Sequence, residues 1–221
     1  MNVIVQLIYF FLLFKNFKCN DITYGSVLKL INLYYEVRLH SHEVKYGGTG
    51  SGQQSVTAIS ESDDHNSYWK VMTPPNIKND ELNVKCGDTI NLLHVSTKKK
   101  LHSHNFLSPL SSNYEISAFD SDKKINSDDN FIVECISKKM FWDRDDSVKF
   151  KHSNTNRYLV VNGQIYSHPI QGQYEVSGKF DNSKKSQWKA AEGIFIKKPH
   201  FNHNEKTKKN NQNSEHIHNE L

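Results

Sequence analysis

The sequence predicts an all-β fold, a β-trefoil of three pseudo-symmetric, four-stranded repeats, because its apolar residues recur with a long period and no helical stripe interrupts them. Leu39, Leu101 and Leu159 are spaced by 62 and 58 residues. Two further sets keep this period: Val56, Ile116 and Val176, and the aromatic residues Trp69, Phe131 and Trp188. Apolar residues within each repeat alternate with a period of two, which is typical of half-buried strands. Since one four-stranded unit leaves its edges open, three units sharing a core are expected to close the sheet.

The composition limits the class of protein. The chain has 221 residues, of which 36% are hydrophobic and 24% charged, so it can bury one substantial core. This excludes fibrous and multi-span membrane proteins. The formal net charge of +4 is scattered along the chain rather than gathered in a basic stripe, which argues against nucleic-acid binding.

The amino terminus resembles a secretory signal. Residues 3–14 form an uncharged, apolar run of 12, shorter than the roughly 20 residues that a membrane-spanning helix needs. We therefore expect a signal peptide over residues 1–20, removed on secretion, with an uncleaved anchor as the alternative. In both cases the remainder enters the secretory lumen.

Each repeat is expected to contain four short strands joined by turns rich in Gly, Ser, Asn and Pro. The predicted repeats span residues 22–73, 80–136 and 144–193, together one domain over 21–193. In the first repeat the strands are expected near residues 27–31, 37–41, 54–60 and 68–72.

Cys86 and Cys135 are the two cysteines inside the predicted domain. An oxidising lumen permits one disulfide between them, and closing a loop of about 50 residues stabilises a fold by roughly 2–4 kcal/mol. Two buried free thiols are the alternative. The chain has neither a CxxC motif nor a Cys/His cluster, so neither a redox motif nor a zinc site is expected.

Two histidine pairs share one face of a predicted strand. His40 and His42, and likewise His102 and His104, are two positions apart. Metal sites use this spacing, but the sequence places no acidic or cysteine ligand beside either pair. We expect hydrogen-bonded structural histidines, with ligand contact as the alternative, and no metal or cofactor.

Other motifs indicate turns rather than chemistry. The glycine-rich residues 47–52 are followed by Gln, not by the Lys and Ser/Thr of a phosphate loop, and indicate a tight hairpin. The acidic pairs are expected to be solvated turn residues; they lie at 63–64, 128–129 and 145–146. Trp69 and Trp188 are expected in the core, whereas Trp142 has no evident repeat counterpart and is predicted at an exposed contact. The candidate ligand surface is His40, His42, Tyr46, His102, His104 and Trp142.

Several of these segments resemble the MIR domain, the module shared by protein mannosyltransferases, inositol trisphosphate receptors and ryanodine receptors. In the first repeat the resemblance lies in LHSH at 39–42, YGGTGSGQQSVT at 46–57 and DDHNSYWKV at 63–71; in the second it lies in LHSH at 101–104 and EISAF at 115–119. The third repeat departs, with LVVN at 159–162. A signal, three MIR repeats and a short tail are together similar to the stromal cell-derived factor 2 family.

Residues 197–221 are almost free of apolar side chains and are expected to form a disordered tail. The chain ends in His218, Asn219, Glu220 and Leu221, which differ from the HDEL retrieval signal by Asn for Asp. We expect retention in the endoplasmic reticulum lumen; secretion is the alternative if the signal is not recognised.

The sequence has no nucleophile and base pair, metal cage or cofactor loop, so a non-enzymatic binding protein without catalytic residues is expected. The family resemblance implies an adaptor that works with lumenal Hsp40 (J-domain) and Hsp70 chaperones and with secretory client proteins. The alternative is a lectin-like module that binds glycans in connection with O-mannosylation quality control.

Overall fold

A computed structural model describes residues 20–120 and 126–196. Within these ranges the chain forms twelve strands and three short 3-10 helices. The first repeat contains β1 (Val27–Asn32), β2 (Arg38–Lys45), β3 (Gln54–Ile59), η1 (His65–Ser67) and β4 (Trp69–Met72). The second contains β5 (Thr89–His94), β6 (Lys100–Leu107), β7 (Tyr114–Phe119), η2 (Ser127–Asp129) and β8 (Phe131–Cys135). The third contains β9 (Ser147–His152), β10 (Tyr158–Ile165), β11 (Tyr174–Lys179), η3 (Lys184–Ser186) and β12 (Trp188–Ile194).

The sheet topology confirms the all-β class and corrects the rest of the predicted fold. All twelve strands belong to one sheet, and the pairings of β10 with β9 and of β7 with β11 and β3 close it into a barrel. The repeats are not four-stranded units, because β1 pairs with β12, β4 with β5 and β8 with β9. The predicted β-trefoil of three four-stranded repeats is therefore wrong. The period in the sequence predicts which positions are equivalent and buried, but it does not predict which strands pair.

The core lies where the period places it. Leu39, Leu101 and Leu159 are all fully buried. Trp69 and Trp188, predicted in the core, are buried as well, and each indole donates Nε1–H to the carbonyl of its own repeat's leucine, Leu39 at 3.0 Å and Leu159 at 2.9 Å. These bonds tie the fourth strand of a repeat to its second.

A ring of backbone hydrogen bonds joins the three repeats. Val84 N donates to Ile22 O at 2.9 Å, Trp142 N to Val84 O at 2.9 Å, and Ile22 N to Trp142 O at 2.7 Å. All three side chains are fully buried, and Trp142 packs edge-on against Phe150. The prediction that Trp142 is exposed is wrong. Its counterparts are Ile22 and Val84, which precede it with the spacing of 62 and 58 residues shown by the leucines.

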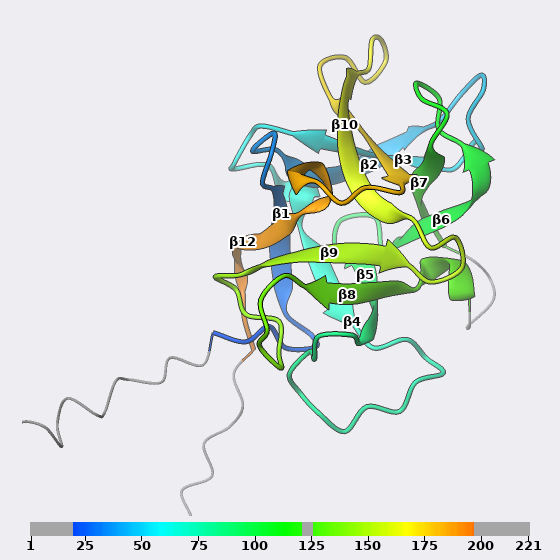
Figure 1. Cartoon of the computed structure of the whole chain (residues 1–221). Helices are drawn as coiled ribbons and strands as arrows, with labels where there is room; N and C mark the ends of the chain where they lie inside the picture. The colour runs from blue at the N-terminus through cyan, green and yellow to red at the C-terminus, as the bar shows by residue number, and fades with distance from the viewer. Residues whose placement is uncertain (1–19, 121–125, 197–221) are drawn as a thin grey trace, which may run out of the picture.

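The hairpins β2–β3, β6–β7 and β10–β11 turn at the opposite end of the barrel, at the top of Figure 1. Two predicted segments lie outside the described residues. They are the signal peptide, apart from Asn20, and the tail with its retrieval-like end. Among the described residues no helix has the length and apolar character to cross a membrane.

Candidate functional site

A polar groove of about 740 Å³ lies beside the first histidine pair. His40 and His42 of β2 form one wall, and residues 171–173 of the β10–β11 loop form another. Residues 59–61 and 63–66, from the end of β3 into η1, form the third. We call it the β2 groove. It combines two repeats, because the third repeat supplies the loop that faces the histidines of the first.

The two imidazoles lie edge to face, with ring centroids 5.0 Å apart. His40 is 4% exposed, and its Nδ1 lies 3.0 Å from Asp64 Oδ2, which also accepts a bond of 2.7 Å from Ser67 Oγ. The Nε2 atoms of both His40 and His42 are buried without a hydrogen-bond partner among the described residues. An imidazole nitrogen needs a partner in either protonation state, so the groove holds unsatisfied hydrogen-bonding capacity.

The charges in the β2 groove are fixed by their surroundings. Burial raises the pKa of Asp64, but hydrogen bonds from Ser67 and His40 outweigh it and hold the pKa below its usual value. Burial lowers the pKa of His42, and the neighbouring His40 lowers it further. At neutral pH the groove therefore presents an ionised carboxylate beside an uncharged His42 ring.

Residues distant in sequence hold the groove's polar groups in place. Thr57 Oγ1 donates a hydrogen bond to Gln173 Oε1. The side-chain amide nitrogen of Gln173 takes no part in this bond. His94, from the second repeat, accepts or donates at both ring nitrogens, 2.9 Å from Asn66 O and 2.8 Å from Thr97 Oγ1. The groove is consequently supported by side chains from all three repeats.

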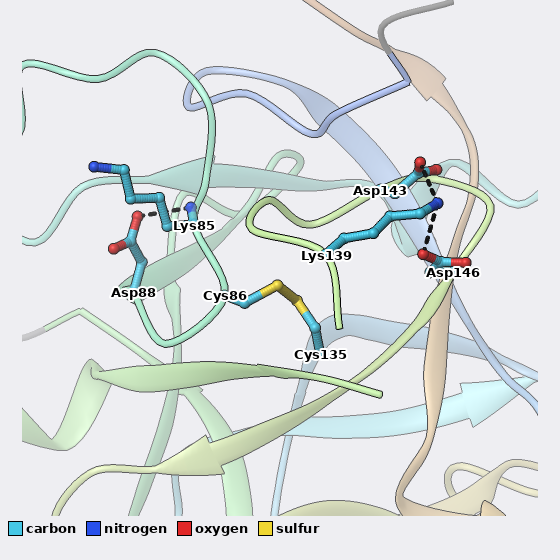
Figure 2. Close-up of a disulfide and its surroundings, with 7 residues drawn as sticks. All are labelled: Lys85, Cys86, Asp88, Cys135, Lys139, Asp143 and Asp146. Carbon is cyan, nitrogen blue, oxygen red and sulfur yellow. Dashed lines mark hydrogen bonds and ion pairs between the residues drawn. A yellow bond between two sulfur atoms is a disulfide. The ribbon is translucent and has the colours of Figure 1, made fainter. Parts of the chain in front are cut away.

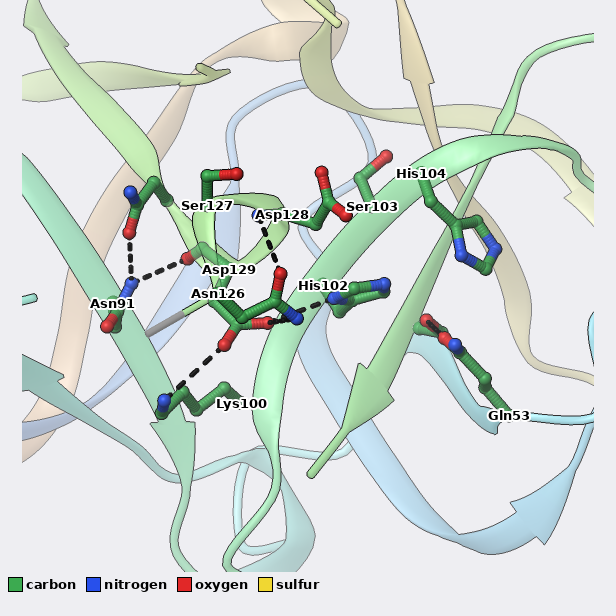
Figure 3. A network of polar contacts seen from close by, with 12 residues as sticks. Gln53, Asn91, Lys100, His102, Ser103, His104, Asn126, Ser127, Asp128 and Asp129 are labelled. Carbon is green, nitrogen blue, oxygen red and sulfur yellow. Dashed lines mark hydrogen bonds and ion pairs between the residues drawn. The ribbon is translucent and has the colours of Figure 1, made fainter. Parts of the chain in front are cut away.

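The second histidine pair has the same plan with different neighbours (Figure 3). His102 Nδ1 lies 2.9 Å from Asp129 Oδ1, and Lys100 Nζ lies 3.4 Å from the other carboxylate oxygen. In the first repeat Arg38 occupies the place of Lys100 and pairs with Glu192 instead. Asp129 therefore contacts a lysine ammonium as well as its histidine.

Aromatic rings flank this second pair. The His102 ring lies 5.2 Å from Phe119 and the His104 ring 5.7 Å from Phe106. The third repeat has Val160 and Asn162 at the histidine positions, and Asn162 Nδ2 donates to the buried Glu175. The three repeats thus share a scaffold. In the first repeat both Nε2 atoms of the histidine pair are buried without a hydrogen-bond partner among the described residues, whereas in the second repeat only that of His104 is.

Several sequence predictions need correction. Tyr46 is 4% exposed, and its hydroxyl bonds the carbonyl oxygens of Val56 at 2.8 Å and Ile116 at 3.0 Å, so it packs beneath the hairpins rather than at a ligand surface. The acidic pairs are not simply solvated, because Asp64 is half-buried against His40 and Asp129 is 1% exposed. Each carboxylate lies within hydrogen-bond distance of a histidine for which the sequence analysis predicted no acidic neighbour.

Cys86 and Cys135 form a disulfide that joins the turn before β5 to the end of β8 (Figure 2). Lys139 follows on the exposed side, with its ammonium 2.8 Å from Asp143 and 2.9 Å from Asp146. Within residues 20–120 and 126–196 no group of three or more His, Cys, Asp and Glu side chains is placed to hold a metal ion.

His94 and His152 are supporting residues that the sequence analysis missed. His152 repeats the bonds of His94, with Thr155 Oγ1 at 2.9 Å and Asp128 O at 3.0 Å. Burial lowers the pKa of both rings. A His-x-x-Thr pattern at 94–97 and 152–155, again 58 residues apart, is the signal that identifies them.

Comparison with known proteins identifies the class of domain in this chain. The MIR domain family matches residues 30–141. A module of the S. cerevisiae protein O-mannosyltransferase Pmt1-Pmt2 complex has the same fold, with a TM-score of 0.72 and 21% identity over 89% of this chain and 32% of that chain.

The similarity to full-length relatives is stronger. The mouse stromal cell-derived factor 2-like protein 1 is 49% identical over 182 residues, 80% of this chain and 79% of the relative. The crystal structure of the SDF2-like protein from Arabidopsis thaliana aligns with a TM-score of 0.75 and 40% identity, covering 80% of this chain and 97% of that chain. The chain belongs to the stromal cell-derived factor 2 family of MIR-domain proteins.

Proposed function

We propose that the chain is a non-enzymatic binding protein whose β2 groove takes a hydroxyl-rich ligand of the mannose type. The observation that carries the proposal is the pair of buried, unpartnered Nε2 atoms of His40 and His42. Vicinal hydroxyls both donate and accept hydrogen bonds, so they complement imidazole nitrogens, a carboxylate acceptor and the amide of Gln173 together.

The charges of the groove favour a neutral ligand. Asp64 is ionised, and Glu61 and Asp63 also line the groove, so an anion would meet repulsion. The polar walls offer little to an apolar ligand. Similarity in fold to an O-mannosyltransferase module supports the choice of mannose as the probe.

The same geometry supports binding rather than catalysis. A serine hydrolase needs a hydroxyl bonded to the histidine of a His–Asp pair. Here Ser67 Oγ bonds Asp64 instead, and no described hydroxyl bonds His40 Nε2. The order His40–Asp64–Ser67 therefore does not activate the serine as a nucleophile.

Titration with methyl α-mannoside, followed by calorimetry or NMR, tests the proposal. His42→Ala should weaken binding about fivefold or more, because it removes one imidazole partner of the ligand and about 1 kcal/mol or more of net hydrogen bonding. His104→Ala is the matched control, since it makes the same change in the second repeat and should leave the affinity unchanged. Equal losses in both variants, or an unaltered affinity for His42→Ala, contradict the proposal.

A second candidate function is the adaptor role with lumenal Hsp40 and Hsp70 chaperones that the family resemblance implies. Exposed apolar side chains on one end of the barrel, Phe106 and Leu107 among them, favour a protein partner. Recovery of chaperones with the full chain after mild crosslinking tests this role. Microscopy with and without Leu221 tests retention in the endoplasmic reticulum.

A further inference from the structure

The loop over residues 60–64, which joins β3 to η1, lacks a restraint that its counterparts have. Asp64 is the N-cap residue of η1, but its side chain makes no capping hydrogen bond. At the equivalent places of η2 and η3, Asn126 and Ser183 each accept a hydrogen bond from a backbone N–H of the helix. The Asp64 carboxylate bonds His40 and a serine hydroxyl instead. The first repeat therefore uses its capping residue in the β2 groove and must hold the loop by other means.

Lys29 of β1 contacts this loop. The residue is 1% exposed, and its Nζ donates a hydrogen bond of 2.5 Å to Ser62 O, two residues before Asp64. The ammonium also lies 4.5 Å from the ring centroid of Tyr68, the residue that follows η1. A buried ammonium is costly unless such partners compensate the water it has lost. Lys29 is consequently bound to the chain on both sides of η1.

A second cation binds the start of the same loop. Arg38 Nη1 donates to Ser60 O at 3.3 Å, and the guanidinium also pairs with Glu192. The hydrogen bond from Arg38 holds the pKa of Glu192 below its usual value, and the nearby charge of Lys29 lowers it further. The two cations thus share one carboxylate and bind two carbonyls of the loop, those of Ser60 and Ser62. The acidic side chains of the loop are left to line the β2 groove.

Lys149 of β9 is the counterpart of Lys29 in the third repeat. It is 5% exposed, and its Nζ donates to Asn182 Oδ1 in the loop before η3. The two lysines are therefore alike in burial and in the loop that they bind. They differ in what that loop carries, because Ser183 stands in the third repeat where Asp64 stands in the first. Only the lysine of the first repeat supports a carboxylate that bonds a histidine.

We propose that Lys29 is a positioning residue of the β2 groove. By holding the Ser62 carbonyl it keeps the Asp64 carboxylate against His40. An ionised carboxylate can only accept, so His40 Nδ1 carries the proton of their hydrogen bond, and Nε2 of the neutral ring is the acceptor for a ligand hydroxyl. Release of the loop would free the His40 ring from this orientation and tautomer. The inference rests on the proposed function and adds to it a residue that does not line the groove.

Nitrogen NMR of the ligand-free, histidine-labelled full chain tests the positioning directly. Lys29→Met should bring the Nδ1 and Nε2 resonances of His40 closer together, because a ring without a fixed partner exchanges between its two tautomers. Lys149→Met is the matched control and should leave both resonances unchanged. Tyr68→Leu, at a half-buried residue, removes only the ring beside the ammonium and should give a smaller shift in the same direction. Circular dichroism establishes that each variant is folded, and Tyr68→Leu decides the question if Lys29→Met is not.

Titration with methyl α-mannoside then measures the consequence for binding. Lys29→Met should weaken the affinity about fivefold or more, as for the loss of one hydrogen bond to the ligand, and Lys149→Met should leave it unchanged. Unaltered His40 resonances in folded Lys29→Met, equal shifts in the Lys149 control, or a wild-type affinity in Lys29→Met would each overturn the proposal. If the wild-type chain binds no sugar, the proposed function fails, whereas the ligand-free spectra still decide whether Lys29 positions His40.

Discussion

The three buried tryptophans provide a matched test of hydrogen bonding in the core. Trp69, Trp142 and Trp188 are all fully buried. The indoles of Trp69 and Trp188 donate to backbone carbonyls, whereas Trp142 Nε1 has no hydrogen-bond partner among the described residues. Substitution by Phe removes a similar volume at each position and removes a hydrogen bond at only two of them.

The expected magnitudes follow from that difference. We assign about 1–2 kcal/mol to the lost packing at each site, in line with large-to-small core substitutions. Trp69→Phe and Trp188→Phe should cost about 2 kcal/mol more, because each also loses a hydrogen bond and strands a buried carbonyl. Trp142→Phe gains back part of its packing loss, because it removes an unpaired donor. Phe131 is buried at the place in the second repeat that corresponds to Trp69 and Trp188, which indicates that the scaffold accommodates Phe at those two positions.

Urea unfolding followed by far-ultraviolet circular dichroism, without reductant, measures these free energies. Trp142→Phe should unfold at a clearly higher urea concentration than either of the other two variants. A Trp142→Phe variant as unstable as Trp188→Phe would refute the reasoning, since the indole N–H would then contribute equally whether or not it has a partner.

Further predictions concern the disulfide, pH and one glycine. Replacing Cys86 and Cys135 with Ser should lower the free energy of unfolding by about 2–4 kcal/mol; an unchanged urea midpoint would show that the bridge does not restrain the unfolded chain. His94 and His152 have lowered pKa values, so the unfolded state binds more protons and stability should fall as the pH drops from about 6.5 through the folded pKa values; melting temperatures that stay level from pH 7.5 to about 5 would argue against this. Gly193→Ala would place a Cβ 2.3 Å from a backbone oxygen of β1, and should cost about 1–3 kcal/mol; a melting temperature equal to the wild type would contradict the close approach.

The sequence predicted much of the core because burial repeats with the period of the chain. The four strands expected in the first repeat lie within a few residues of β1 to β4. The period did not predict the closed barrel, because strand pairing across repeats depends on contacts between ends of the chain, such as that of β1 with β12. Trp142 was misplaced for a related reason: its counterparts, Ile22 and Val84, are aliphatic and lie outside the strands.

The candidate site was predicted only in part. The spacing of His40 and His42 correctly placed both rings on one face of a strand. Their partners follow from tertiary structure, since Asp64 is 24 residues from His40 and Gln173 belongs to another repeat. Tyr46 follows a strand and precedes a glycine-rich loop, a context typical of exposed residues, but its hydroxyl finds two buried carbonyl oxygens.

The central claim is that the first histidine pair contacts a hydroxyl-rich ligand, and nitrogen NMR of the imidazole rings tests it most directly. Addition of methyl α-mannoside to histidine-labelled protein should shift the Nε2 resonances of His40 and His42 in a saturable way. The rings of His102 and His152 should remain unchanged. Unshifted resonances for His40 and His42 at saturating sugar, or equal shifts at all four rings, would contradict the account.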